Sequence, residues 1–120
     1  MYRRISVIFM MLLGVSSAVE LPEVSKQEIA HLFAYLEKSG CQFNRNGTLY
    51  SAEEAVAHLH KKYNYLTKKA LLGSTEDFIK GAASSSSISK KPYFVKCGSL
   101  SPIESAVWFT TELERHRRAQ

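Results

Sequence analysis

This sequence of 120 residues lacks the short patterns that usually mark an enzyme. It has no G-x-S-x-G turn for a serine nucleophile, no Ser-His-Asp order, and no glycine pattern of a Rossmann or P-loop nucleotide site. We therefore expect a protein that is not an enzyme and that uses no cofactor. A small hydrolase is a third class of function, and it would need a concave pocket with a perturbed acid or base.

Metal-binding patterns are also missing. The two cysteines are far apart, so the C-x-x-C spacing of zinc and redox sites is absent. His58 and His60 lie two positions apart on an expected helix, so their side chains diverge by about 200° and cannot chelate one ion together. His31 and His116 belong to other helices. We expect no metal site, and we expect His58 to be partly buried with one hydrogen-bond partner.

Long apolar runs are scarce. The longest, residues 5–15, is too short to cross a bilayer as a helix. It follows two arginines and precedes three small residues, which is the order of a secretory signal peptide over residues 1–18. We predict cleavage between Ala18 and Val19. The mature chain, residues 19–120, would then be one small domain outside the cytoplasm, not an integral membrane protein.

The only two cysteines, Cys41 and Cys97, form an even pair in a chain that is expected to be exported. Such pairs usually form disulfides. In the chain-entropy picture a bond between residues this far apart contributes roughly 4 kcal/mol to stability. We predict a structural disulfide. It would place a strand near Cys97 beside the segment that follows Cys41.

Three stretches match the capping box, in which a serine and a glutamate three residues later satisfy the first backbone groups of a helix. They begin at Ser25, Ser51 and Ser101, and the third also has Pro102 at the first helical position. The four expected helices cover about 26–38, a segment from 52 to near Lys69, a shorter segment capped by Ser74 or Thr75, and about 102–115.

Asn46-Gly47 indicates a two-residue type I′ turn, because both residues tolerate a positive φ. The resulting hairpin over 42–50 pairs Arg45 with Thr48 and Phe43 with Tyr50. Residues 93–97 have the aromatic and β-branched content of a third strand. We therefore predict an α+β fold, in which a small three-stranded antiparallel sheet (hairpin 42–50 plus strand 93–97) is packed by about four helices.

Positive charge gathers in the middle of the chain. Loss of the first 18 residues would lower the formal charge from +5 to +3, yet residues 39–97 alone sum to +5. The loop 84–92 adds four consecutive serines before two lysines. The basic middle of the chain could be only a solvated surface without a partner, and the loop could be only a flexible connector. The candidate binding surface consists of Lys61, Lys62, Lys68, Lys69, Ser86, Ser87, Ser89, Lys90 and Lys91.

Several segments together are similar to one family. They are FNRNG at 43–47, SAEEA at 51–55, HL at 58–59, TEDFI at 75–79, AASSSS at 82–87 and KPY at 91–93. Over about residues 25–115 the chain resembles the YfeK-like family of small exported bacterial proteins, a domain of unknown function. The resemblance implies the periplasm of a Gram-negative bacterium, and it carries no catalytic residues.

Two functions follow as expectations. The first is a non-enzymatic binding or accessory module whose partner is an anionic component of the cell envelope or an envelope protein, and not a nucleic acid. The second is an inhibitor of a cell-wall hydrolase that acts through the loop from Ser84 to Lys91, since hydroxyls and lysines suit a cleft lined by carboxylates.

Overall fold

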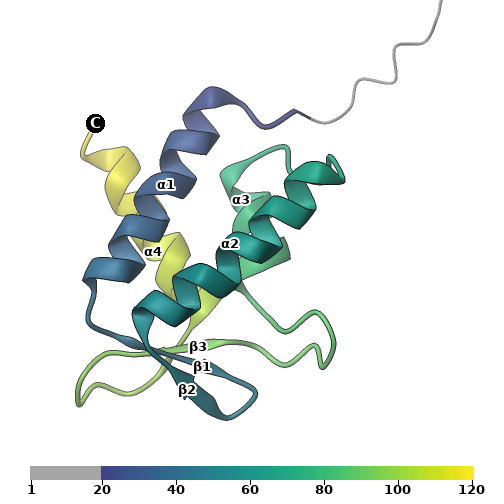
Figure 1. Ribbon diagram of the computed structural model, residues 1–120. Helices are drawn as coiled ribbons and strands as arrows, with labels where there is room; N and C mark the ends of the chain where they lie inside the picture. The colour runs from purple at the N-terminus through teal and green to yellow at the C-terminus, as the bar shows by residue number, and fades with distance from the viewer. Residues whose placement is uncertain (1–19) are drawn as a thin grey trace, which may run out of the picture.

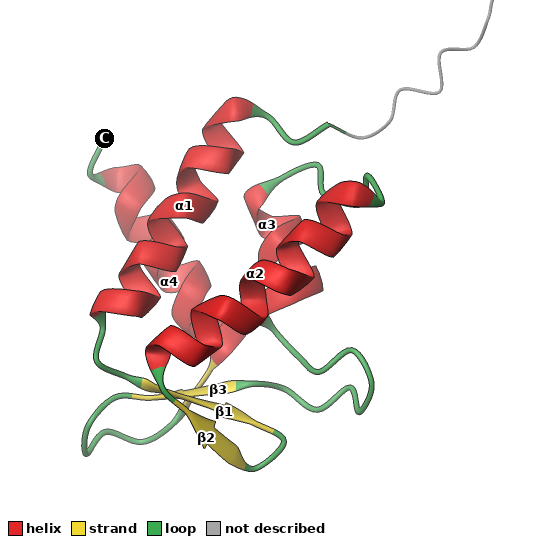
Figure 2. Ribbon diagram, viewed as in Figure 1, coloured by secondary structure: helices red, strands yellow, loops and turns green. Residues whose placement is uncertain are grey.

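The computed structural model describes residues 20–120, in which helices cover one face of an antiparallel sheet (Figures 1 and 2). This is the predicted α+β class. The predicted signal peptide and its cleavage site at Ala18–Val19 lie outside the described residues. The elements in chain order are α1 (Glu23–Lys38), β1 (Gln42–Arg45), β2 (Thr48–Tyr50), α2 (Ala52–Lys68), α3 (Thr75–Phe78), the π-helix η1 (Ile79–Ala83), β3 (Phe94–Lys96), β4 (Ile103–Glu104) and α4 (Ser105–Arg118).

The sheet has four strands rather than the predicted three, in the order β2-β1-β3-β4. The extra strand is the segment that was predicted to open the last helix. Ile103 pairs with Val95 of β3, and α4 begins only at Ser105, whose N–H donates to the Tyr93 carbonyl at 2.8 Å. The capping box predicted at Ser101 is therefore wrong. Its residues extend the sheet because β3 offers them a free edge.

The hairpin has the predicted register. Phe43 faces Tyr50 and Arg45 faces Thr48 across the β1–β2 pair. The turn residues Asn46 and Gly47 have φ values of 53° and 86°, the positive angles that a type I′ turn needs. Local turn chemistry fixes this part of the fold.

The capping box that opens α2 is formed as predicted. Ser51 Oγ accepts from the Glu54 N–H at 3.1 Å, and Glu54 Oε1 accepts from the Ser51 N–H at 3.2 Å. Ser74 caps α3 in a simpler way, through its hydroxyl oxygen and the Asp77 N–H at 3.1 Å. Ser51 is exposed and Ser74 is half-buried, and each uses its hydroxyl oxygen to satisfy a backbone N–H of the first helical turn.

The capping box predicted for α1 is wrong. The helix begins at Glu23 after Pro22, so Ser25 lies inside it and is buried. Val24, which would pack on Ile29 as a hydrophobic staple if Ser25 were the cap, is exposed. The helix ends before Gly40, whose φ of 68° provides the left-handed stop.

The Glu28 carboxylate, predicted to close the α1 cap, instead joins three parts of the chain. It accepts from the Thr75 hydroxyl at 2.6 Å and from Arg117 Nε and Nη2 at 2.7 and 2.9 Å. Arg117 Nη1 also lies 2.6 Å from Glu76 Oε1. The hydrogen bonds from Arg117 lower the pKa of Glu28 to about 2, and burial opposes this shift. We call Glu28, Thr75, Glu76 and Arg117 the terminal clamp, because it ties the first helix to the last.

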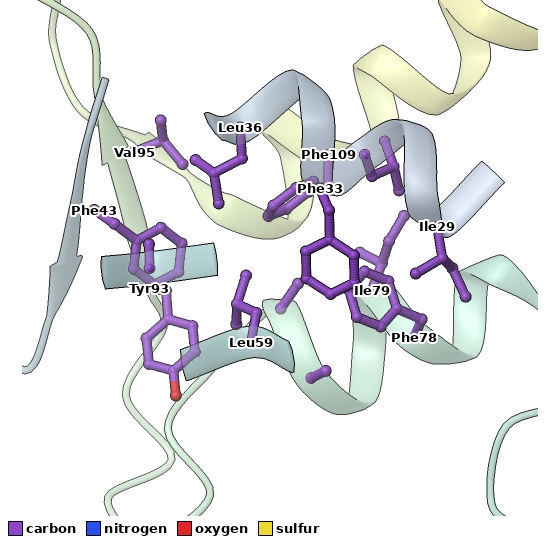
Figure 3. Close-up of a cluster of buried hydrophobic side chains, with 14 of the residues drawn as sticks. Ile29, Phe33, Leu36, Phe43, Leu59, Phe78, Ile79, Tyr93, Val95 and Phe109 are labelled. Carbon is purple, nitrogen blue, oxygen red and sulfur yellow. The ribbon is translucent and has the colours of Figure 1, made fainter. Parts of the chain in front are cut away.

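One core lies between the sheet and the helices (Figure 3). Helices α1, α3 and α4 and the π-helix η1 each bury apolar side chains there, and Ala106 of α4 is half-buried at its edge. In α2 the buried residues are Ala52, Ala55 and Leu59, and Val56, Tyr63 and Leu66 are half-buried at the edge of the core. The large side chains with almost no exposed surface are Ile29, Leu32, Leu36, Phe43, Leu59, Phe78, Tyr93, Val95, Phe109 and Leu113.

The disulfide between Cys41 and Cys97 is present, with its two Cα atoms 4.3 Å apart. It joins the residue before β1 to the residue after β3. These two strands pair directly, with Phe43 opposite Val95. The prediction that the third strand lies beside the hairpin is therefore confirmed.

Candidate functional site

Positive charges from three segments meet where the hairpin, α2 and the loop 84–92 come together. The charges of Arg45 and Lys90 both act on Lys62, and those of Arg45, Lys61 and Lys62 act on His58. None of the ion pairs within residues 20–120 involves any of these four cations. We call Arg45, Lys61, Lys62 and Lys90 the basic face.

Lys62 is the member that connects α2 to the loop. It belongs to the candidate binding surface, and it is half-buried. Its Nζ donates to the Ser85 carbonyl at 2.9 Å and to the Tyr93 hydroxyl at 3.2 Å, and it lies 4.9 Å from the centroid of the Tyr93 ring. Lys62 is therefore part of the structure of the face as well as of its charge.

Tyr93 lies at the centre of the face. Figure 3 shows its ring beside Phe43 in the core and its hydroxyl directed away from the labelled cluster. The hydroxyl oxygen is 3.3 Å from His58 Nε2. Because lysine only donates, Tyr93 accepts from Lys62, and its own proton is free to point at an unprotonated His58 nitrogen. The expectation that His58 is partly buried with one partner is confirmed.

The pKa values of these groups describe a site that carries positive charge at neutral pH. Burial, together with the charges of Arg45, Lys62 and Lys61, lowers the pKa of His58 to about 4. Burial, with Arg45 and Lys90, lowers the pKa of Lys62 to about 8, and burial raises the pKa of Tyr93. At pH 7 the imidazole and the phenol are neutral and Lys62 is charged. The arrangement suits the binding of an anion.

The loop 84–92 is closed by its own hydrogen bonds. Ser85 bridges to Pro92, the Ser86 N–H donates to the Lys91 carbonyl at 2.9 Å, and the Lys90 N–H donates to the Ser86 carbonyl at 3.0 Å. The segment was predicted to be a loop because it could bury little. It is a loop, but local hydrogen bonds and the attachment to Lys62 hold it in place.

Not all of the predicted loop residues reach the surface. Ser86 is buried, and its hydroxyl oxygen accepts from the Ser89 N–H at 3.3 Å. Ser87, Ser89, Lys90 and Lys91 are exposed. The Ser89 hydroxyl donates to Asn46 Oδ1 at 2.7 Å, so the loop also contacts the tip of the hairpin.

Sequence reasoning did not assign a role to Ile88, which is 95% exposed near the tip of this loop. Its apolar side chain between serines was the signal that could have been used. An aliphatic side chain held almost wholly in water has no packing role in this domain. Among residues 20–120 it is the most exposed of the large hydrophobic residues.

Lys68 and Lys69 stand apart from the basic face. They are exposed at the end of α2, seven residues beyond Lys61 and Lys62 and so about 10 Å along the helix axis. Lys69 Nζ lies 5.9 Å from the centroid of the Tyr65 ring. That axial separation is comparable with the Debye length of about 8 Å, so salt screens much of the interaction of Lys68 and Lys69 with Lys61 and Lys62.

The other three histidines contact different neighbours. His31 Nε2 lies 3.3 Å from Glu112 Oε1, and the His31 ring stacks on His116 with centroids 3.9 Å apart. His60 stacks on Phe33 at the same centroid distance. Across residues 20–120 there is no group of three or more histidine, cysteine or acidic side chains placed to hold a metal ion. In the same range, no helix is both long and apolar enough to span a bilayer.

Comparison with known sequences finds relatives without an assigned activity. Residues 23–117 match the family described as "Family of unknown function (DUF5329)". The chain is 43% identical over 64 residues to "Uncharacterized protein YfeK" of Salmonella typhimurium, and the alignment covers 53% of this chain and 52% of that protein. The matched region thus spans about half the length of this curated relative. No solved structure matches the chain.

Proposed function

The chain belongs to this YfeK-like family of unknown function, and we propose that it is an exported, non-enzymatic binding or accessory module that holds an anionic component of the cell envelope on its basic face. One observation carries the proposal. Four cations from three segments converge without an acidic partner among the described residues. These positive charges repel one another and lower the pKa values of Lys62 and His58. A bound anion would reduce that repulsion.

The cellular location of the protein is part of the same proposal. The disulfide between Cys41 and Cys97 suits an oxidising compartment such as the periplasm. The arginine-led apolar run before residue 19 has the order of a signal peptide. Intact-mass analysis of the periplasmic fraction tests this location, with a chain that starts at Val19 expected. An uncleaved chain that stays in the cytoplasm would contradict it.

The binding experiment compares two triple variants with equal loss of charge. One replaces Arg45, Lys61 and Lys90 with glutamine, which keeps the structural Lys62. The control replaces three exposed cations outside the basic face, namely Lys38, Lys80 and Arg118. Each protein is sedimented with vesicles of phosphatidylglycerol and phosphatidylcholine, with phosphatidylcholine vesicles alone, and with isolated peptidoglycan.

We expect wild type and the control to bind an anionic material at low salt and to lose binding as salt rises. The reason is screening, because the Debye length falls from about 30 Å at 0.01 M salt to about 8 Å at 0.15 M. The basic-face variant should not bind. Equal binding by both variants would show that net charge alone is responsible. No binding by wild type to either anionic material would refute the proposal.

A second function, inhibition of a cell-wall hydrolase, is favoured by Ile88. A closed loop presents this side chain almost fully exposed, with Lys90 and Lys91 beside it. Burial of an isoleucine in a pocket of the partner would contribute about 2 kcal/mol, and the lysines would suit carboxylates around that pocket. Rigid exposed anchors of this kind carry much of the binding energy at interfaces.

The test of this second function follows peptidoglycan lysis by a muramidase with increasing amounts of the protein. The Ile88→Ser variant should lose inhibition that wild type shows. Leu100→Ser, at an exposed leucine in a different loop, should keep it. Absence of inhibition by wild type would leave the binding module as the only proposal.

A further inference from the structure

A shallow pocket adjoins the basic face between α2, η1 and the loop 84–92. Its volume is about 230 Å³, which corresponds to about eight water molecules at liquid density and therefore to one aromatic ring or a branched alkyl group. Its walls are mostly apolar. The residues around it are Lys61, Lys62, Tyr65, Leu66, Gly81 and Ser87.

The π-helix shapes one wall of this pocket. Gly81 lies in η1, and a Cβ atom at that position would come within 3.2 Å of Leu66 Cδ1. The Ser84 hydroxyl donates to the Ile79 and Lys80 carbonyls at 2.9 and 2.6 Å and so satisfies the wide turn. Single π-turns inside helices frequently accompany functional sites. Here the π-turn places a residue without a side chain against α2, and the pocket stays open.

The chemistry of the pocket is divided between its walls and its rim. Tyr65 and Leu66 supply apolar surface, and Tyr65 is largely exposed. The rim carries the two amines of Lys61 and Lys62. Two donors of Lys62 are used by Ser85 and Tyr93, which leaves one N–H, and Lys61 makes no ion pair with the described residues. A ligand that matches both parts has an apolar group joined to an anionic group.

We propose that this pocket binds the apolar group of an amphiphilic anion, with its phosphate or carboxylate held by Lys61 and the remaining N–H of Lys62. The proposal rests on the proposed function, because the basic face supplies the charge. It adds that the ligand is not a bare anion. A free organic phosphate and an anionic lipid at a membrane surface share this chemistry.

The test titrates ¹⁵N-labelled protein with phenyl phosphate and, separately, with inorganic phosphate, while amide shifts are followed by NMR. Burial of about half of the ring should make phenyl phosphate bind about tenfold more tightly. Amides near Tyr65, Leu66 and Gly81 should shift with phenyl phosphate and much less with inorganic phosphate.

Two variants separate the wall from the rim. Tyr65→Ala removes exposed apolar surface and should reduce the tenfold preference to nearly none, with inorganic phosphate binding unchanged. Leu49→Ala, at an exposed leucine on β2, is its matched control and should keep the preference. Gly81→Ala, which narrows the pocket, should act as Tyr65→Ala does. Lys61→Gln should weaken both ligands by similar factors.

The outcomes distinguish this inference from the proposed function. If both phosphates bind wild type equally, the apolar pocket is not a ligand site, whereas the anion-binding function stands. If neither binds and anionic vesicles do not bind either, both proposals fail. A Tyr65→Ala variant that also loses vesicle binding would identify a lipid as the ligand. Loss of the phenyl phosphate preference alone would identify a soluble organic anion.

Discussion

Replacement of Glu28 with glutamine is the sharpest test of the terminal clamp. The Glu28 side chain is only 7% exposed, and it accepts three hydrogen bonds, one from Thr75 and two from Arg117. Glutamine keeps the shape and one acceptor oxygen, but it removes the charge that Arg117 binds with two donors. The variant therefore probes the ion pair with little change in packing.

The size of the effect follows from the pKa of Glu28. A pKa of about 2 in the folded protein, against 4.5 for an unperturbed glutamate, corresponds to about 3 kcal/mol at neutral pH. Arg117 is 43% exposed, so solvent screens part of this interaction. We expect Glu28→Gln to lower the free energy of unfolding by about 2 kcal/mol at pH 7.

The pH dependence has a definite sign. Because folding lowers the pKa of Glu28, its stabilisation is fully present above about pH 4.5 and is lost as pH falls through about 2. The difference between wild type and Glu28→Gln should therefore shrink steadily over this window. Urea unfolding followed by circular dichroism, at pH 7, 4.5, 3.5 and 2.5, measures the difference directly.

Two controls separate the Glu28–Arg117 pair from general charge effects. Glu76→Gln removes the partner of Arg117 that is 57% exposed and should lower stability by less than about 1 kcal/mol. Arg118→Gln removes a neighbouring arginine that makes no ion pair within residues 20–120 and should change stability by less than about 0.5 kcal/mol. A Glu28→Gln deficit that is absent at pH 7, or that stays constant down to pH 2.5, would refute the reasoning.

Three further changes have defined outcomes. Replacing both Cys41 and Cys97 with serine opens a link of sequence separation 56 and should lower the free energy of unfolding by about 4 kcal/mol, measured by urea unfolding against the oxidised wild type. By the same assay, Ser51→Ala should lower the free energy of unfolding by about 1 kcal/mol, because the Ser51 hydroxyl caps α2. Ser101 precedes β4 and caps no helix, so Ser101→Ala should change the free energy of unfolding by less than about 0.5 kcal/mol. Equal losses in the two variants would contradict the assignment of the caps. Gly47→Ala should cost about 1 kcal/mol because φ is 86° there, and an unchanged urea midpoint would count against a strained turn.

The capping boxes show how well a local sequence pattern predicts the start of a helix. Three stretches carry the same signature, yet only Ser51 with Glu54 forms the motif. At the start of α1, the buried Glu28 carboxylate finds an arginine partner from the far end of the chain, which outweighs a cap on the surface. Near Ser101, the free edge of β3 recruits Ile103 into the sheet. In both cases the deciding partner is distant in sequence, so no local pattern reveals it.

The candidate site divides in the same way. The sequence identified both the lysines of α2 and the serine-lysine loop as binding candidates, and the structure joins them through Lys62 and Ser85. The sequence could not show that Lys62 points toward the core. Helical spacing tells which residues share a side of the helix, but it does not tell which neighbouring segment covers that side. Nor could it show that Tyr93 would hold Lys62 and His58 on one hydroxyl. Lys68 and Lys69 are lysines of the same segment, but they lie outside the basic face.

The pairing of β1 also has a consequence for the order in which the chain folds. Its first neighbour, β2, follows directly, but its second neighbour, β3, comes much later in the sequence. Until β3 arrives, the hairpin is a marginal two-stranded ribbon with an open edge that foreign strands can join. Glu28 of α1 likewise has no Arg117 partner until the end of the chain has emerged. The incomplete chain, in which the edge of β1 is unpaired, is therefore the species most exposed to aggregation.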